Sequence, residues 1–245
     1  MKAPAQLYKY HTANYRRVVD ALNQVERQGR RAIAMEDRKA LKALLPLYGL
    51  LIGASAETRL QKILFEPGAF DDLQRAAVMN ANSQFDRWKR LLDVAFRAHN
   101  RLNPKTALKK DTLPIREFLI YEELGELLDH ELRIIIEVRN KLAHGQWEYP
   151  LNEDCTDVLQ EKKKLLNQEN LLSLKFKRTI IDNLLSIMRD LTVSHGTLQR
   201  DFEMYHNRLS HARRSLANRS YEKYKQSLIE KRKRGDLERV ANYRK

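Results

Sequence analysis

Residues 134–147 read IIIEVRNKLAHGQW and form the apolar end of a long helical pattern. Gly145 follows a cluster of Arg, Asn and His, and glycine most often ends a helix because its backbone adopts the left-handed conformation without steric cost. The pattern therefore places Arg139 on the last turns and His144 at or just past the helix end. If the helix continues to His144, five residues at about 100° each set the two side chains roughly 140° apart. If it unwinds one or two residues earlier, they can converge.

The spacing of this Arg/His pair does not by itself identify a site. Similar spacings occur twice more in the chain, at Arg189/His195 and at Arg200/His206. Only the first pair follows an aliphatic run and lies within Arg-Asn-x-Leu-Ala-His-Gly, so the other two are interpreted as ordinary helix-surface residues. A structural role for the first pair stays open, in which His144 caps helix carbonyls and Arg139 pairs with Glu137 or another carboxylate.

The segment Arg-Asn-Lys-Leu-Ala-His-Gly at 139–145 resembles the HEPN superfamily (higher eukaryotes and prokaryotes nucleotide-binding). It looks most like the abortive-infection and toxin branch of bacterial HEPN proteins, which is related to the nuclease domains of RNA-targeting CRISPR effectors. The resemblance is carried by about ten residues and a compatible helical pattern. It implies metal-independent cleavage of RNA, with Arg139 and His144 catalytic and Asn140 assisting. In members of this family a polar or acidic residue on an early helix often faces the catalytic pair.

These residue types suit that chemistry. RNA supplies its own nucleophile, the 2′-OH, so the protein needs to move protons and stabilise a crowded phosphorane. A histidine with a pKa near neutrality can act as general acid or base, and an arginine offers phosphate oxygens a planar, permanently charged fork. One histidine cannot readily be both acid and base. The resemblance therefore implies a homodimer with two Arg/His sets in one cleft, leaving 2′,3′-cyclic phosphate and 5′-OH ends.

Glu57 is the candidate for the acidic residue on the early helix. It lies near the start of a predicted helix over residues 56–65, which Ser55 and Thr58 would cap. A carboxylate at that position also complements the helix dipole, and this capping role is the favoured interpretation of Glu57.

The charge balance indicates a polyanionic partner. The chain of 245 residues has 46 Lys and Arg against 32 Asp and Glu, a formal net charge of +14. Such an excess favours nucleic acid, here RNA, over an acidic membrane surface. No His/Asp/Glu cluster has zinc-like spacing, so neither a metal nor another cofactor is expected.

The remaining composition predicts a soluble, cytoplasmic protein. Cys155 is the one cysteine, which excludes an intramolecular disulfide and a cysteine-based zinc site. The N-terminus has no apolar signal-peptide region. The most apolar run, residues 44–54, is about half of the roughly 20 residues that a membrane span requires, and Pro46 and Gly49 interrupt it.

Helical periodicity over most of the chain predicts an all-α, HEPN-like bundle over residues 1–196. The apolar stripe of a first helix covers residues 7–25 and closes at Gly29. A second pattern begins near Asp37 and is kinked or broken at Pro46 and Gly53. A long helix follows from Phe70 to before Asn103. The central helix begins near Pro114, and its broad apolar face suggests contact on two sides, for example with a second subunit.

One segment allows a different structure. Leu172, Leu174 and Phe176 alternate with polar residues as in a half-buried strand, and residues 167–170 could form its turn. A small β-hairpin is therefore included in the predicted fold. Helical pattern returns at Thr179 and stops at residues 195–196.

Residues 197–245 form a basic helical extension, with fourteen Lys and Arg against six Asp and Glu. Cations that neutralise phosphates make binding salt-sensitive, and the interleaved tyrosines either stack on unpaired bases or anchor the helix to the bundle. The sequence is equally compatible with two roles for Trp147, stacking on an RNA base and packing in the core. The predicted RNA contacts are Lys141, Trp147, Arg213, Arg214, Arg219, Lys223, Lys225, Lys231, Arg232, Lys233 and Arg234.

The leading functional prediction is an endoribonuclease of toxin or phage-defence type, for which an antitoxin protein or a small RNA is a conceivable further partner. A non-catalytic HEPN protein that grips a structured or small RNA is the alternative. A purely structural helical adaptor explains the apolar stripes but leaves the charge of +14 without a role.

Overall fold

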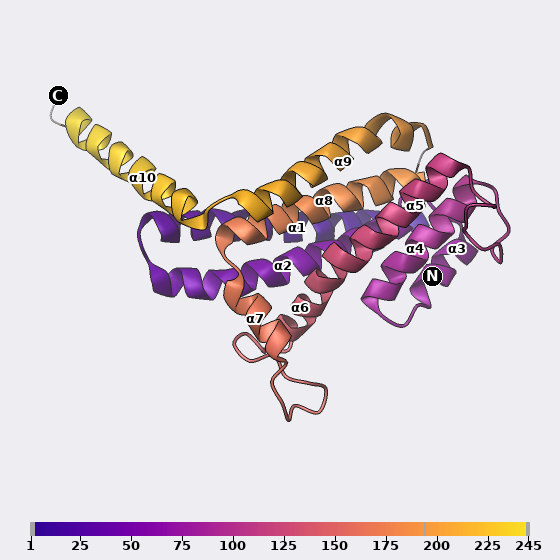
Figure 1. Cartoon of the computed structure of the whole chain (residues 1–245). Helices are drawn as coiled ribbons and strands as arrows, with labels where there is room; N and C mark the ends of the chain where they lie inside the picture. Colours follow the sequence, from indigo (N-terminus) through magenta and orange to yellow (C-terminus); the bar gives the residue numbers. More distant parts are fainter. Residues whose placement is uncertain (1–2, 194, 244–245) are drawn as a thin grey trace.

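A computed structural model describes residues 3–193 and 195–243, and every regular element within these ranges is helical (Figure 1). The all-α prediction is therefore confirmed. The elements are α1 (Pro4–Ala34), α2 (Arg38–Leu64), α3 (Asp72–Met79), α4 (Gln84–His99), α5 (Ile115–Leu127), η1 (Leu128–Leu132), α6 (Arg133–Ala143), α7 (Gln160–Gln168), α8 (Leu171–Val193), α9 (His195–Asn218) and α10 (Tyr221–Tyr243).

Helix α1 has the amphipathic character that its stripe predicts, but it does not close at Gly29. It continues to Ala34, with Ile33 buried. Gly29 lies inside the helix where a Cβ atom would come within 2.8 Å of Leu171 Cδ1. The glycine therefore permits close packing of α1 on α8 and does not end the helix.

Helix α2 corrects the prediction of breaks at Pro46 and Gly53. It runs without interruption from the Asp37 cap, whose carboxylate accepts a hydrogen bond from the Ala40 N–H at 2.9 Å. A proline inside a helix costs about 3 kcal/mol. Tertiary packing outweighs that cost, because the face that carries Tyr48 and Ile52 is fully buried.

The predicted cap at Ser55 and Thr58 is also wrong, since both residues lie in the interior of α2. The Ser55 hydroxyl donates to the Ile52 carbonyl at 2.8 Å, and the Thr58 hydroxyl donates to the Ala54 carbonyl at 2.9 Å. These bonds to the preceding turn replace the cap that the sequence pattern suggested.

The long helix expected from Phe70 is divided into α3 and α4 by residues 80–83, which include Asn80, Asn82 and Ser83. Ser83 caps α4, and its hydroxyl oxygen accepts the Asp86 N–H at 3.0 Å. The favourable cap explains why the helix restarts here.

The predicted central helix is confirmed as the rod α5–η1–α6, which begins directly after Pro114. One five-residue stretch of it, η1, is a π-helix. Such π turns interrupt α-helices in short pieces, often near functional sites. The buried residues of the rod are Leu124, Leu127, Leu128, Leu132, Ile135, Ile136 and Leu142.

The predicted hairpin is wrong. No strand occurs in the part of the chain that the structure describes, and an isolated bridge joins Leu151 to Val158. Asn170 caps α8, and its side-chain oxygen accepts the N–H groups of Leu172 and Ser173 at 3.0 and 2.9 Å. The alternation after Asn170 belongs to a helix that is buried on most sides, so apolar residues are not confined to one stripe.

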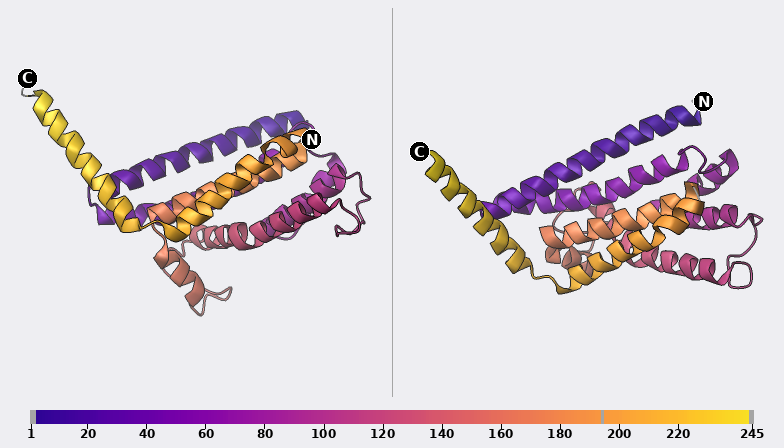
Figure 2. Two further views of the ribbon diagram at one scale, coloured as in Figure 1. Left: turned by 45° about the horizontal axis from the view of Figure 1, so that its top comes forward. Right: turned by 90° about the horizontal axis from the view of Figure 1, so that it is seen from above.

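The basic extension is helical, as predicted. Helix α9 runs back along α8 and buries Leu198, Leu209 and Ala212 (Figure 1). Helix α10 begins against α1, where Tyr221 and Tyr224 pack on the core, and then projects beyond the bundle (Figure 2). These two tyrosines therefore anchor the helix. The side chain of Tyr243 lies outside the described residues.

Helix α2 is, among the described helices, the one long and apolar enough to cross a membrane by length and composition. Core helices of soluble proteins pass the same test. The fully buried residues of α2 pack against α1, α6 and α8 within the bundle.

Candidate functional site

The candidate site begins where α6 crosses α2. A Cβ atom at Gly53 would lie 2.3 Å from Arg139 Cβ, so this crossing requires a glycine. Close approach of the two backbones brings the Arg139 side chain over the next turn of α2. Gly49 lies one turn earlier on the same face, near Leu142.

Arg139 forms a network with two other candidate residues. One of its terminal nitrogens, Nη2, donates to Glu57 Oε2, and Nη1 donates to the side-chain oxygen of Asn140 at 3.0 Å. The Arg139 and Glu57 side chains are 27% and 37% exposed, so the ion pair stays accessible from solvent. Glu57 lies in the middle of α2, so the preferred capping interpretation of this residue is wrong.

His144 terminates α6, as the position of Gly145 predicted. Its backbone N–H donates to the Asn140 carbonyl at 3.2 Å, and Gly145 has a positive φ of 75°. The Gly145 N–H bonds to the Leu142 carbonyl and the Gln146 N–H bonds to the Lys141 carbonyl, at 3.1 and 3.0 Å. These two bonds form a Schellman motif, so the helix end is fixed by backbone geometry.

The same geometry separates the two catalytic candidates. The i to i−4 bond at His144 keeps this residue on the helical path, which places the Arg139 and His144 side chains roughly 140° apart. Arg139 turns toward α2, whereas His144 is exposed. In the described residues, no hydrogen bond or ion pair occupies the imidazole, so His144 does not cap carbonyls. The structure brings Arg139, Asn140 and Glu57 together but not Arg139 and His144 within one chain.

The carboxylate partner of Arg139 is Glu57 and not Glu137. Glu137 pairs with Lys162 of α7 at 3.1 Å. The two predicted RNA contacts beside the site also have structural partners. Trp147 Nε1 donates to the Leu142 carbonyl at 2.9 Å, and Lys141 Nζ donates to the Leu151 carbonyl at 2.6 Å. Both bonds tie the following loop to the helix end, and 43% of Trp147 remains exposed.

The predicted contacts on α9, on α10 and at Arg219 between them fall into two groups. Three are paired, namely Arg213 with Glu131 at 3.0 Å, Lys225 with Glu222 at 3.7 Å and Arg232 with Asp236 at 3.3 Å. The other six have exposed side chains without a hydrogen-bond or ion-pair partner in the described ranges: Arg214, Arg219, Lys223, Lys231, Lys233 and Arg234.

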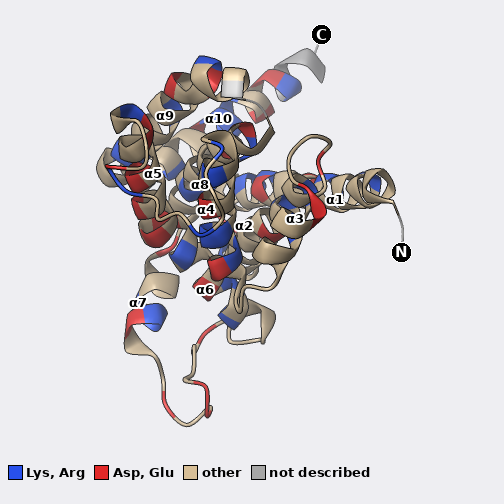
Figure 3. Ribbon diagram, turned by 90° about the vertical axis from the view of Figure 1, so that its right-hand side faces the viewer, with Lys and Arg blue, Asp and Glu red and all other residues tan. Residues whose placement is uncertain are grey.

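These cations lie apart from the end of α6. Figures 1 and 2 show α10 leaving the bundle at the turn between α1 and α2, away from α6. In the view of Figure 3, basic and acidic segments alternate along the helices, which is consistent with the many ion pairs of the fold. Six cations that are unpaired within the described residues therefore lie on the extension, and others, such as Lys9, Arg16 and Arg17, lie on α1.

The arginines of the other two Arg/His pairs are paired with carboxylates. Arg189 donates to buried Glu66, with Nε at 2.9 and 3.0 Å from the two carboxylate oxygens, while the side chain of His195 lies outside the described residues. Arg200 pairs with Asp201, and His206 Nε2 lies 2.6 Å from Glu123 Oε1. In the described ranges, no group of three or more His, Cys, Asp or Glu side chains is arranged to hold a metal ion.

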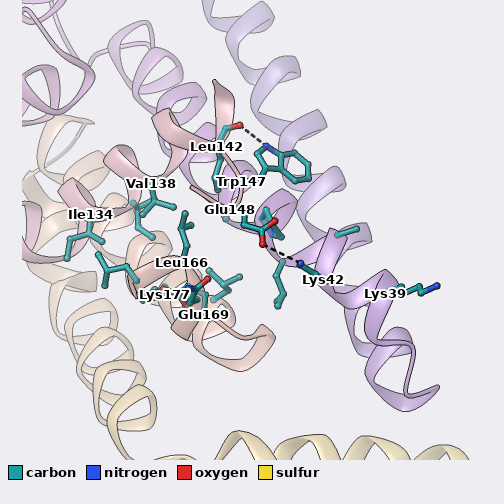
Figure 4. A pocket seen from close by; sticks show the side chains of 18 residues that line it. Lys39, Lys42, Ile134, Val138, Leu142, Trp147, Glu148, Leu166, Glu169 and Lys177 are labelled. Atoms are coloured by element: carbon teal, nitrogen blue, oxygen red, sulfur yellow. Dashed lines mark hydrogen bonds and ion pairs between the residues drawn. The ribbon is translucent and has the colours of Figure 1, made fainter. Parts of the chain in front are cut away.

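Sequence reasoning missed a cavity of about 620 Å³ beside Trp147 (Figure 4). It lies between α2, α6, α7 and the start of α8, and its walls are largely aliphatic. The one signal in the sequence is the run of compact residues Ala43, Pro46 and Gly49, three positions apart on α2, which leaves space opposite Val138 of α6.

No family model, curated protein or solved structure matches this chain. The HEPN resemblance therefore rests on the motif at 139–145 and on the helical pattern around it.

Proposed function

We propose that this protein is a cytoplasmic, metal-independent endoribonuclease of toxin or phage-defence type, which acts as a homodimer. The observation that carries the proposal is the network of Glu57, Arg139 and Asn140 at the accessible end of α6, followed by an exposed and unoccupied His144. Glu57 fixes the direction of the guanidinium, and a preorganised cation stabilises developing phosphate charge better than a mobile one.

The proposed reaction needs no group beyond the RNA and these side chains. The 2′-OH attacks the adjacent phosphorus while a neutral histidine removes its proton, and the bond to the 5′ oxygen breaks as a protonated histidine supplies a proton to it. Arg139 stabilises the negative charge of the phosphorane. The products carry 2′,3′-cyclic phosphate and 5′-OH ends.

We infer that two copies of the chain form the site, because the Arg139 and His144 side chains leave α6 in different directions. On ideal helix geometry, Arg139 and His144 of one chain leave α6 about 140° apart, so we do not assign both to the same phosphate. A second copy supplies both the second histidine and an arginine at a different angle. We propose that the unpaired cations of α10 contact the RNA backbone at a distance from the cleaved bond. A further partner, either an antitoxin protein or a small RNA, would restrain the toxin.

The test uses the full chain. Wild type, His144→Ala and the control His211→Ala are incubated with total cellular RNA in EDTA, and fragment ends are mapped. The proposal predicts cyclic-phosphate ends from wild type and His211→Ala, and intact RNA with His144→Ala although binding persists. Equal cleavage by His144→Ala contradicts it.

A non-catalytic RNA-binding function is the second candidate, and one observation favours it. Glu57 neutralises Arg139, and an arginine already paired with a carboxylate has less charge to offer a phosphate. Intact RNA whose mobility all three proteins shift equally, more strongly at low salt, supports this alternative.

A further inference from the structure

The cavity beside Trp147 has the size and lining of a ligand site. Its volume of about 620 Å³ lies within the range of small-molecule pockets, roughly 300–1,000 Å³. Aliphatic side chains of four helices form the walls, including Leu45 of α2, Val138 of α6, Leu166 of α7 and Leu174 of α8. No segment in the described ranges fills it. An occupant with an apolar body would bury this surface, which is a favourable change.

The charged residues at the edge of the cavity indicate which chemical group the polar end of the occupant carries. Figure 4 shows Lys42 paired with Glu148 at the edge of the cavity. The Lys42 Nζ and Glu148 Oε1 atoms are 3.9 Å apart. The Lys42 and Glu148 side chains are well exposed, at 80% and 64%. An ion pair with this separation in solvent contributes little to the stability of the protein. An incoming anion can therefore replace Glu148 at Lys42.

Two further cations lie at the cavity. Lys177 is committed to Glu169, whereas Lys39 lies one turn before Lys42 and has no ion-pair partner in the described part of the chain. Its side chain extends away from Lys42 in Figure 4, so it must rotate to reach a carboxylate bound at Lys42. The lining thus holds three lysines against two glutamates, so a single negative charge balances it.

We propose that this cavity binds a free, medium-chain fatty-acid-like carboxylate, with its alkyl chain between α2, α6 and α7 and its carboxylate at Lys39 and Lys42. This site is independent of the proposed ribonuclease activity. Trp147 provides a reporter of occupancy, because it lines the cavity and is 43% exposed, whereas Trp88 is fully buried in the core.

The test is calorimetric titration of the full chain with monomeric dodecanoate, combined with tryptophan fluorescence. We expect one site per chain and a blue shift of the emission as the indole of Trp147 leaves water. Dodecanol, which has the same chain and no charge, is expected to bind about tenfold or more weakly. Equal binding of the two probes overturns the assignment of the head group.

Two variants locate the site. Lys39→Glu/Lys42→Glu is expected to weaken dodecanoate binding by about tenfold or more, while Lys9→Glu/Arg16→Glu on α1 makes the same charge change and leaves it unaltered. Ala43→Trp fills the cavity from an exposed position of α2, so the fold is retained, and binding is abolished. Unchanged binding by Ala43→Trp, or partition of the protein onto anionic vesicles with no response to monomeric dodecanoate, overturns the proposal.

Discussion

Glu57 of α2 and Arg139 of α6 form an ion pair beside the close crossing of these helices at Gly53, and the two residues are 82 positions apart in the chain. The pair links the helix that ends in His144 to the core helix of the bundle. It therefore contributes both to the packing of α6 and to the direction of the guanidinium.

A double-mutant cycle measures this relationship. Glu57→Gln and Arg139→Gln are each expected to destabilise the protein, and together they cost less than the sum of the two single changes. Both side chains are partly exposed, so the coupling free energy should be about 0.5–1 kcal/mol in urea unfolding. A coupling of zero contradicts the pairing.

Gly53→Ala tests the close approach of the two helices. The new methyl would lie 2.3 Å from Arg139 Cβ, so α6 must shift, and we expect a loss of about 1–3 kcal/mol in the free energy of unfolding. Gly125→Ala in α5 is the control, because its Cβ meets no atom within 4 Å. It should stabilise the protein by up to about 1 kcal/mol through helix propensity. Equal effects of the two changes would contradict the crossing.

Stability should depend on pH through Glu66. Burial disfavours its charged form, but hydrogen bonds from Arg189 and the nearby charge of Lys62 outweigh burial and lower the pKa of this carboxyl below its ordinary value of 4.5. A carboxyl with a lowered folded-state pKa contributes stability that is fully present above the unfolded-state pKa and is lost as pH falls through the folded-state pKa.

Glu66→Gln should therefore destabilise the protein by about 2 kcal/mol at neutral pH, and its difference from wild type should shrink as pH falls below 4.5. Denaturant unfolding at a series of pH values measures this difference. Glu203→Gln, at an exposed position of α9, is the control and should show little change at any pH. A difference that is independent of pH contradicts the assigned ion pair.

The salt dependence of RNA binding tests the role of α10. Replacing Lys231, Arg232, Lys233 and Arg234 by Gln removes up to four phosphate contacts. The slope of log K against log salt for single-stranded RNA should become shallower by up to about 2.8. Four matching changes away from α10, at Lys9, Arg16 and Arg17 of α1 and at Lys105 of the loop after α4, should alter the slope less. Equal slopes for the two variants would place the RNA elsewhere.

Local signals predicted the parts of the fold that depend on neighbouring residues. The end of α6 at Gly145 and the start of α2 at Asp37 follow from backbone freedom and side-chain capping, which act within one turn. Periodicity over the central rod predicted most of its buried face, but Leu119, which the same pattern placed on that face, is exposed. The candidate cluster was partly predictable for the same reason, because Arg139 and Asn140 are adjacent in sequence.

The errors arise where tertiary contacts overrule local preference. Pro46 does not end α2 because Tyr48 and Ile52 of the following turns are buried in the core, and α8 lacks a clear helical stripe because it is buried on most sides. The pairing of Glu57 with Arg139 depends on the crossing at Gly53, which no local pattern specifies. The cavity beside Trp147 is likewise a property of four packed elements.

The most direct test of the composite site is a mixing experiment. Wild-type protein is equilibrated with a large excess of His144→Ala, and the rate of RNA cleavage in EDTA is compared with the rate of wild type diluted by the same excess of bovine serum albumin. If each cleft needs both histidines, mixed dimers are inactive and the rate falls far below that of the diluted control. A rate equal to the control would show that one chain suffices and would contradict the two-copy site.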